Sequence, residues 1–347
     1  MVNIITPAPA DWDAFVAAQT TSTSFPRAHI LQLAAWGALK SAFGWTSETV
    51  ALTDSGQLIG GALLLFRRLP YRLGTMAYLP LGGYEGDPTN RTDLWQAIHA
   101  CARRHRAAFL KWEYGISDTP PDFTALGFRA SPQTIQPPNT ILIDIAGDDE
   151  TILARMNQGT RRKIRQSQKN GILYKEGTRA DVEIFTRMMG ATGTRNEFGI
   201  HAPEYYGKAY DLFVPQYAAL ILAEHAGDPL AGIMVFAVGK TAWYLYGASS
   251  DVKRNLMGAY GVQWAAIQWA KARGCTTYDM WGIPDAGATQ LEAEFETRSD
   301  GLWGVYGFKR GWGGQVVRSV GAWDRVYNPI IYAGYQWMLK RRASEGE

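Results

Sequence analysis

The loop at residues 250–259 combines residue types whose spacing suits anion chemistry. It contains Arg254, Gly258 and Ala259, and it joins an aromatic, β-prone stretch at 241–250 to a helical pattern that begins near Tyr260. A glycine-containing turn before a helix directs free backbone N–H groups toward an anion or a developing oxyanion. The loop therefore favours an anion site, although a plain structural turn has the same sequence pattern.

A lysine near the end of the chain is a second candidate for chemistry. Lys309 follows Phe308 and precedes the glycine-rich turn Gly311-Trp-Gly-Gly314. Such glycines let the backbone approach a ligand closely, so Lys309 is a candidate fixed cation. The alternative is a surface lysine that pairs with Glu294 or Glu296.

Two acids end predicted buried strands at equivalent places. Asp279 lies in the stretch 277–281 and Glu113 ends the stretch 108–113. Both are candidate bases, and the alternative for each is a helix cap or a salt bridge. The sequence has no readable Ser-His-Asp or Cys-His arrangement and no His/Cys cluster with metal-ligand spacing, so no metal is expected. His201 has no nearby partner that would mark it as catalytic, and a surface position is expected for it.

The segment from Thr151 to Lys175 is basic and contains no acid. Its pattern predicts a helix that ends at Asn170-Gly171. It is either a solvated helix face or a phosphate-binding patch, because like charges at this density repel one another unless a polyanion neutralises them. The central basic residues are Arg161, Arg162, Lys163 and Arg165.

Length and composition indicate an ordinary globular chain. The 347 residues suggest two domains, and 46% apolar against 19% charged residues allows large cores. The net charge is only +3, so affinity for polyanions must come from local patches. The two cysteines, Cys101 and Cys275, are expected to be reduced and buried, as in a cytoplasmic protein. No signal peptide is expected, and the longest apolar run, 58–66, is too short to cross a bilayer.

The two halves of the chain follow the same order of motifs. The tryptophan-led helix at Trp95 before Glu113 is echoed by Trp264 before Asp279, and three further short matches keep the same order. This echo predicts a duplicated α/β unit with mixed sheets flanked by helices. We expect a first domain at 1–148 and a second at 149–319, with a ligand cleft at or near their interface.

Four stretches together resemble one protein family. The most specific is Gly304-Val-Tyr-Gly-Phe308-Lys309-Arg-Gly-Trp-Gly-Gly314, and the others lie at 31–40, 159–165 and 244–256. In order and spacing they are similar to the Fem-type aminoacyltransferases (the FemA, FemB and FemX group), over roughly residues 25–335. The resemblance implies two tandem acetyltransferase-like domains, α/β (α+β) in class. It also implies the shorter, FemX-like form, whose final helix, here 320–347, returns to the first domain.

The same resemblance implies an activity and its partners. Family members transfer an amino acid from aminoacyl-tRNA, as co-substrate and without another cofactor, to the side-chain amine of a peptidoglycan precursor, either UDP-MurNAc-pentapeptide or lipid II. A cytoplasmic monomer is expected. The residues Trp337, Met338 and Lys340-Arg341-Arg342 themselves suggest either peripheral contact with the inner membrane face or only the cations that are ordinary at a helix C-terminus. Lys309 would steady the oxyanion that forms when an amine attacks the ester carbonyl.

The family's motifs give residue roles by position. Phe308 and Lys309 match the pair beside the reacting centre. Residues matching the acceptor groove are Trp36, Lys40, Arg195 in a loop, Tyr206, Tyr246 and Arg254. The basic residues Arg161, Arg162, Lys163 and Arg165 would hold tRNA phosphates.

Two other functions stay open. An acyl-CoA-dependent N-acyltransferase would use the Arg254–Ala259 loop as a pyrophosphate cradle, but this loop is one residue longer than the usual acetyl-CoA loop. A non-enzymatic RNA- or precursor-binding protein would bind without turnover. The sequence leaves open which amino acid is transferred and which diamino acid accepts it.

Overall fold

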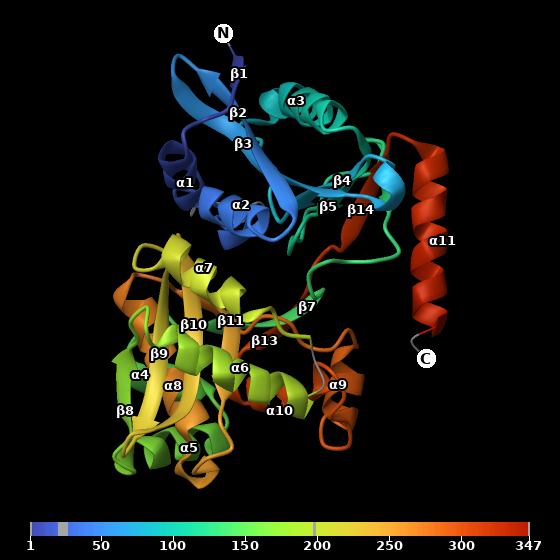
Figure 1. The fold of residues 1–347 in the computed structure, drawn as a ribbon. Helices are drawn as coiled ribbons and strands as arrows, with labels where there is room; N and C mark the ends of the chain where they lie inside the picture. The colour runs from blue at the N-terminus through green and yellow to red at the C-terminus, as the bar shows by residue number, and fades with distance from the viewer. Residues whose placement is uncertain (1, 20–26, 197–198, 346–347) are drawn as a thin grey trace. The chain divides into compact units, whose positions relative to one another are not determined.

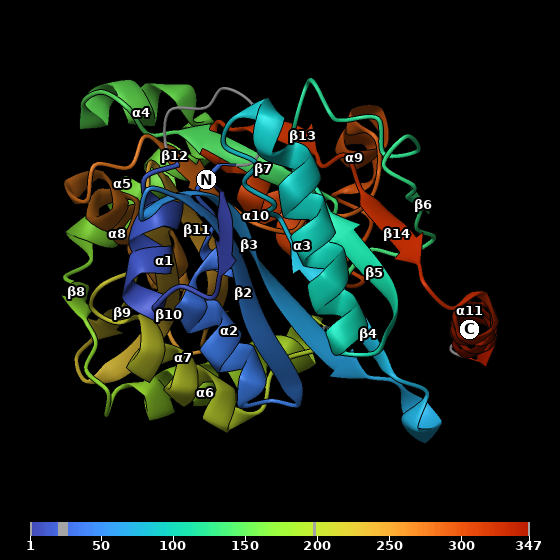
Figure 2. The same cartoon turned by 90° about the horizontal axis from the view of Figure 1, so that it is seen from above.

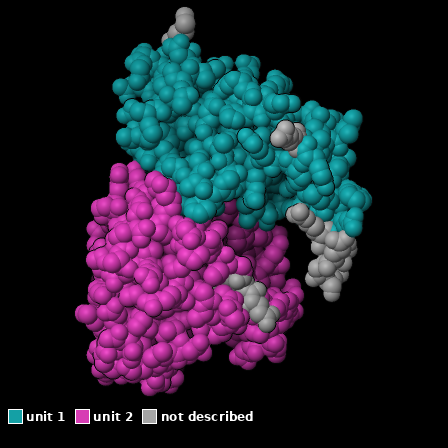
Figure 3. All heavy atoms as spheres, viewed as in Figure 1, with its two compact units in different colours: residues 1–135, 319–347 teal, residues 136–318 magenta. Residues whose placement is uncertain are grey.

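The computed structural model describes residues 2–19, 27–196 and 199–345, and the chain divides into two compact units. Unit 1 comprises residues 1–135 and 319–347, and unit 2 comprises residues 136–318 (Figure 3). Each unit contains one seven-stranded sheet. The predicted mixed α/β class is therefore confirmed.

The sheet of unit 1 has the strand order β1-β2-β3-β4-β5-β14-β6. Neighbours are antiparallel except β4 and β5, which are parallel and are joined through helix α3. The strands are β1 (Asn3–Ile5), β2 (Trp45–Asp54), β3 (Gln57–Arg68), β4 (Thr75–Pro80), β5 (Ala107–Glu113), β6 (Arg129–Ala130) and β14 (Ala322–Val326). The helices are α1 (Pro9–Ala17), α2 (Ala34–Ser41), α3 (Arg91–Arg104) and α11 (Pro329–Glu345).

Helices cover both faces of this sheet because side chains alternate along its strands. Leu64 of β3 packs in the cluster that contains Ile98 of α3, whereas its neighbour Leu63 points toward Gly37 of α2. Figure 1 shows α2 and α3 on opposite sides of β2 and β3. The strands β3, β4 and β5 are accordingly almost continuous apolar runs, as expected for strands buried on both faces.

Unit 2 repeats this arrangement with the order β8-β9-β10-β11-β12-β7-β13. Its parallel pair is β11 and β12, joined through α8. The strands are β7 (Asn139–Asp144), β8 (Leu173–Glu176), β9 (Ala218–His225), β10 (Asp228–Val238), β11 (Thr241–Ser249), β12 (Thr277–Asp279) and β13 (Gln315–Arg318). The helices are α4 (Asp149–Arg155), α5 (Gln158–Lys169), α6 (Val182–Asn196), α7 (Pro203–Phe213), α8 (Gly258–Ala272), α9 (Ala288–Glu294) and α10 (Trp303–Lys309).

The two faces of the second sheet carry different helices. Ile233 and Val235 of β10 belong to the core formed with α5, α8 and α10. On the other face, Phe236 packs edge-on against Phe213 of α7, and Gly232 faces Phe185 of α6. In Figure 2 the strands of this sheet lie between α5 and α8 on one face and α6 and α7 on the other. The apolar periodicity predicted for 260–270 is thus the buried face of α8.

Strand pairing determines where the chain divides, because β14 returns to the sheet of unit 1 whereas β7 already belongs to the sheet of unit 2. Strand β14 follows unit 2 in the chain but pairs with β5 and β6 of unit 1, and β7 precedes most of unit 2 but pairs with its β12 and β13. The division therefore falls between residues 135 and 136, earlier than the boundary after residue 148 inferred from sequence. Residues 319–347 group with unit 1 for the same reason.

Two local expectations need correction. The basic helix expected from Thr151 is two helices, α4 and α5, because Asn157 adopts an extended conformation and caps α5 by accepting from the backbone N–H of Thr160 at 2.7 Å. Helix α6 continues through Arg195, which was expected in a loop. Across the described residues, no helix has both the length and the apolar character needed to cross a membrane.

Candidate active site

A cavity of about 530 Å³ lies within unit 2, where β11 extends past its parallel neighbour β12. β12 pairs only with the first part of β11, so residues 244–249 of β11 form a wall with no strand beside them on that edge. Other walls come from α6, the start of α8, the turn at 281–282 and α10. Carboxyl ends of parallel strands are a common place for ligand sites in α/β proteins.

Lys309 is buried in the wall of this cavity. Only 7% of the residue is exposed, and its ammonium donates to the backbone carbonyls of Gly282 at 2.6 Å and Trp281 at 3.2 Å. The Nζ atom lies 5.6 Å from the centre of the Tyr244 ring. Burial lowers the pKa of Lys309 to about 7, while the Asp279 carboxylate favours the charged form. The expected alternative of a surface ion pair with Glu294 or Glu296 is therefore wrong.

The turn that holds Lys309 has an unusual backbone. Trp281 adopts φ +57°, a left-handed conformation that is uncommon for a bulky residue. A side chain at Gly282 would come within 2.7 Å of the Pro137 ring, so only glycine fits there. The turn thus presents two adjacent carbonyl groups to one buried ammonium.

The carboxylate of Asp279 holds the turn at 281–282 in place. It accepts from the backbone N–H of Trp281 at 2.7 Å and from the hydroxyl of Thr140. Burial raises the pKa of Asp279 to about 6, against the opposing effect of those two hydrogen bonds and Lys309. Asp279 is not among the described residues that line the cavity. Its contacts therefore suit a positioning role for the turn that holds Lys309.

Aromatic side chains form the apolar part of the cavity. Phe308 lies beside Lys309 and packs edge-on against Tyr260, with ring centres 5.0 Å apart. At another wall the hydroxyl of Tyr246 donates to that of Tyr205 at 3.3 Å, and Tyr206 accepts from the backbone N–H of His201. Burial raises the pKa of Tyr246 well above 10, so its hydroxyl stays protonated.

Two arginines complete the cavity on its polar side. Arg195 donates to the hydroxyl of Ser249 at 2.9 Å and pairs with Asp251 at 2.8 Å. Arg254 lies 3.6 Å from the same carboxylate, and 64% of its side chain is exposed. Both arginines line the cavity and approach the same carboxylate, so two cationic groups lie close together at this wall.

A second cavity of about 440 Å³ lies at the start of α8 and shares Ser249, Arg254, Ala259 and Tyr260 with the first. Lys163 reaches it from α5, donating to the Tyr260 hydroxyl at 3.0 Å. Lys253 lines it as well and pairs with Asp228 at 2.7 Å. Cations and a helix N-terminus at one cavity suit a phosphate group.

The other basic residues of α5 are used differently. Arg161 donates to the backbone carbonyls of Met156 and Ala154, while Arg162 and Arg165 are exposed. The sequence grouped all four residues together, and of them only Lys163 lines a described cavity.

Three predicted site residues lie in unit 1. The ammonium of Lys40 lies 4.7 Å from the centre of the Trp36 ring on α2. Burial, followed by the nearby charge of Arg67, lowers the pKa of Lys40 to about 8. Glu113 is buried at the end of β5 and accepts from the Tyr78 hydroxyl and the backbone N–H of Ile135.

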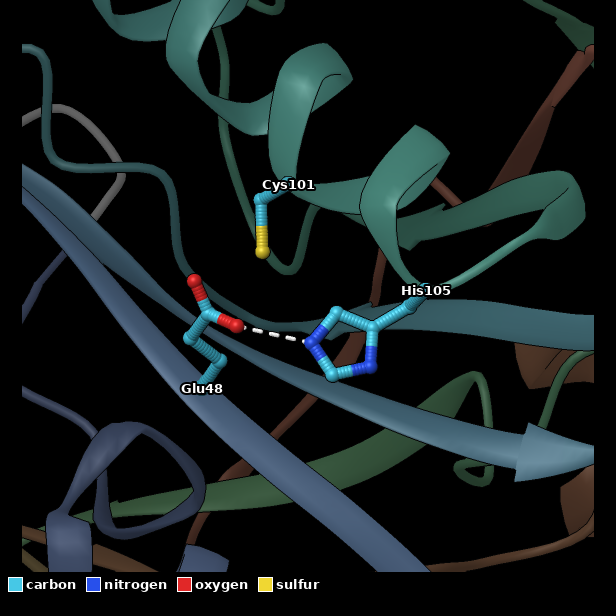
Figure 4. Close-up of side chains that lie close together, drawn as sticks. All are labelled: Glu48, Cys101 and His105. Carbon is cyan, nitrogen blue, oxygen red and sulfur yellow. Dashed lines mark hydrogen bonds and ion pairs between the residues drawn. The ribbon is translucent and has the colours of Figure 1, made fainter.

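Unit 1 also brings together Glu48, Cys101 and His105 (Figure 4), whose possible ligand atoms all lie within 4.8 Å of one another. The Glu48 carboxylate is already bonded to the His105 ring at 2.7 Å and to the Arg104 guanidinium. Burial, together with the charge of Glu48, raises the pKa of the Cys101 thiol to about 12. These contacts describe an ion-pair network that joins β2 to the end of α3, and we assign no metal to it.

Several residues of the main cavity were not predicted as part of the site, and four of them carry aromatic rings. His201 is exposed, as expected from the sequence, but it also lines the cavity and stacks on Tyr205 with ring centres 3.7 Å apart. Trp281, Tyr260 and Tyr244 also line it. Their nearness to Asp279, to the α8 N-terminus and to Tyr246 in the sequence was the available signal.

Comparison with known proteins assigns the chain to a family. It matches the FemAB family over residues 121–228 and 223–340, which is more than half of the chain. A lipid II:glycine glycyltransferase of Staphylococcus saprophyticus is 25% identical, with 92% of both chains covered. One of Staphylococcus aureus strain USA300 is 24% identical, also with 92% of each chain covered.

Solved structures show the same fold. The crystal structure of FemX superposes with a TM-score of 0.80 at 22% identity, covering 95% of this chain and 99% of that one. A tandem acetyltransferase-type (GNAT) protein from the clavulanic acid pathway gives a TM-score of 0.52 at 12% identity, covering 93% and 98%. Both the predicted acetyltransferase-like fold and the resemblance to the Fem group are confirmed.

Proposed function

The chain belongs to the FemAB family and is an aminoacyltransferase, and from this premise we propose that it builds peptidoglycan interpeptide bridges with aminoacyl-tRNA as donor. The acceptor is the side-chain amine of the stem peptide in a peptidoglycan precursor. The curated relatives are named for lipid II and glycine. We therefore take lipid II as the first acceptor to test, UDP-MurNAc-pentapeptide as the second, and glycine as the first amino acid.

The observation that carries this proposal is the buried ammonium of Lys309 in the cavity wall, beside Phe308. Attack of the neutral amine on the ester carbonyl forms a C–N bond and places negative charge on the carbonyl oxygen. A cation held without reorganisation stabilises that charge strongly in a buried site. The C–O bond to the ribose then breaks, and the proton released by the amine passes to the ribose oxygen.

The two adjoining cavities suit the 3′ end of the aminoacyl-tRNA donor. Phosphates of the tRNA 3′ end would lie at the start of α8, near Lys163, Lys253 and Arg254, all of which line the second cavity. The shared residues Arg254 and Tyr260 lead from there to Lys309. No covalent enzyme intermediate and no further cofactor are required. Arg195, Tyr206 and Tyr246 would hold the acceptor peptide, and Lys40 its diphosphate.

The direct test is a mass measurement on the precursor. Purified protein is incubated with a mixture of aminoacyl-tRNAs and either lipid II or UDP-MurNAc-pentapeptide. We expect one acceptor to gain the mass of a single amino acid residue, and only when intact aminoacyl-tRNA is present. An unmodified precursor across all aminoacyl-tRNAs would refute the proposal. We expect the active protein to be a monomer on the cytoplasmic side, where both substrates are made.

One observation favours a second candidate. The cavity at the start of α8 also suits a pyrophosphate, as an acyl-CoA-dependent N-acyltransferase needs. Micromolar binding of acetyl-CoA, with displacement by desulfo-CoA but not by tRNA, would support that candidate instead.

A further inference from the structure

The exposed face of α11 in unit 1 carries large apolar side chains. Ile330 is 85% exposed and Trp337 is 63% exposed. They are seven residues apart, so they lie on one face of the helix. The opposite face is packed in the unit, where Tyr332 lies edge-on to Phe109 with ring centres 5.2 Å apart. This face of α11 is therefore not needed for the core of unit 1.

The same helix is basic toward its end. Lys340 and Arg341 are exposed, and Arg341 lies 5.7 Å from the centre of the Trp337 ring. The sequence of α11 contains no acid before Glu345. An exposed apolar strip that continues into cations, with no acid between them, combines the two attractions that hold a peripheral segment at an anionic membrane interface.

The turn between β3 and β4 repeats this combination. Tyr71 is 92% exposed and Leu73 is 46% exposed, at the tip of a turn in which Tyr71 itself has φ +55°. Arg68 and Arg106 are exposed beside this tip, and the backbone carbonyl of Arg106 accepts from Thr75. Residues 67–76 contain no acid.

The turn and the helix are neighbours within unit 1. The Tyr335 hydroxyl of α11 lies 4.0 Å from the sulfur of Met76, at the start of β4. Figures 1 and 2 both show the turn before β4 beside α11. We call this region the docking face, with the apolar members Tyr71, Leu73, Ile330 and Trp337 and the basic members Arg68, Arg106, Lys340 and Arg341.

We propose that the docking face binds an anionic membrane surface. Tryptophan and tyrosine favour the headgroup depth of a bilayer, aliphatic side chains enter below it, and arginine and lysine attract anionic lipids. A second copy of the chain would bring like charges together. A nucleic acid would leave the aliphatic Ile330 and Leu73 without a partner, because they cannot stack on bases. The reason for docking, access to a lipid-linked acceptor, rests on the proposed function.

The binding test uses the full chain and sedimentation with vesicles. Phosphatidylcholine vesicles that contain about 30% phosphatidylglycerol should retain the protein, and pure phosphatidylcholine vesicles should retain much less of it. The double variant Ile330→Ser, Trp337→Ser should bind about tenfold more weakly. Lys340→Gln and Arg341→Gln should each cost about fivefold at low salt, and less at high salt.

A matched control variant separates docking from nonspecific hydrophobic adsorption to vesicles. Leu173 on β8 of unit 2 is 60% exposed, and Leu173→Ser should leave vesicle binding unchanged. Equal binding of wild type and the double variant would overturn the proposal. So would a dimer in wild type that the double variant lacks, or weaker tRNA binding by Arg341→Gln with unchanged vesicle binding.

A turnover comparison keeps this inference distinct from the proposed function. The double variant should process a soluble nucleotide-linked precursor at the wild-type rate and lipid II in anionic vesicles at least about fivefold more slowly. Equal losses on both acceptors would overturn the docking role. If the wild-type protein turned over neither acceptor, the proposed function would be refuted. The vesicle measurements would still decide whether the docking face binds a membrane.

Discussion

Lys309, the proposed catalytic cation, is held in place by two backbone carbonyl groups. If the ammonium stabilises charge that develops only in the transition state, Lys309→Ala should lower kcat by about 10²-fold or more, with a smaller effect on KM. Arginine should rescue poorly, because its planar group does not fit a site built for a point charge between two carbonyls. Single-turnover rates measure the chemical step directly. A folded Lys309→Ala protein with wild-type turnover would remove Lys309 from the mechanism.

Burial of Lys309 also links stability to pH. Its pKa is lowered from 10.5 to about 7 on folding, so between these values the unfolded chain binds more protons than the folded one. This group therefore makes stability rise with pH from about 7 to about 10.5, and its destabilising effect is complete below pH 7. We expect Lys309→Met to gain stability over wild type at pH 6 and to lose that advantage near pH 10.5. Urea denaturation at both pH values tests this, and an advantage that does not change with pH would contradict it.

Asp279 allows the roles of base and positioning group to be separated. As a positioning residue it needs only an acceptor for the Trp281 N–H, so Asp279→Asn should keep most of kcat and Asp279→Ala should lose it. Leaving that N–H unsatisfied should also destabilise the protein by about 1–3 kcal/mol. A general base would instead be abolished equally in both variants. Rate and thermal stability of the pair therefore decide between the two roles.

Single residues were only partly predictable from the sequence. The glycine-rich motif identified Phe308 and Lys309, but not that Lys309 is buried, because its carbonyl partners are 27 and 28 residues earlier in the chain. The surface position expected for His201 is confirmed, but its place in the cavity was missed for the same reason: its contact with Tyr246 joins segments that are far apart in sequence.

Helix α5 and the start of α8 act together as one basic element. Lys163 and Arg254 line the same cavity. Lys163→Met and Arg254→Met should therefore each weaken tRNA binding, and each should reduce by about one unit the slope of the logarithm of the binding constant against the logarithm of salt concentration. The exposed Arg187 of α6 provides a control of equal charge change. Binding of acylated tRNA at several salt concentrations measures both quantities. Equal effects of all three variants would indicate nonspecific attraction.

The elements themselves were largely predictable. The stretches 108–113 and 241–250 were predicted as strands and correspond to β5 and β11, and the three- and four-residue spacing gave α8. The short strands were not apparent: β6, β13 and β14 have two to five residues each and little apolar alternation. The break between α4 and α5 depends on one extended residue, Asn157, within an otherwise helical pattern.

At the scale of the whole molecule, a buried ion pair fastens the end of the chain to unit 1. Asp324 of β14 lies 3.0 Å from the ammonium of Lys111 on β5, and both side chains are almost fully buried. Asp324 also accepts from the Tyr332 hydroxyl at 2.9 Å, so the pair joins β5, β14 and α11.

This pair gives a stability prediction. Asp324→Ala should destabilise the fold by about 3–5 kcal/mol, since it leaves Lys111 charged and buried. The double variant Lys111→Met, Asp324→Leu should recover much of that loss. Chemical denaturation of wild type, Lys111→Met, Asp324→Leu and the double variant forms a complete cycle. A small loss in Asp324→Ala would indicate that water reaches Lys111 there.

The late position of β14 in the chain also affects how the protein is made. Unit 2 is one continuous segment, whereas the sheet of unit 1 lacks an internal strand until residues 322–326 have been synthesised. During translation the second unit to be made is therefore the first that can complete its sheet. Until residues 322–326 have emerged from the ribosome, the half-built sheet of unit 1 exposes β5 along the edge that β14 will cover, and at that stage the nascent chain most needs protection by chaperones.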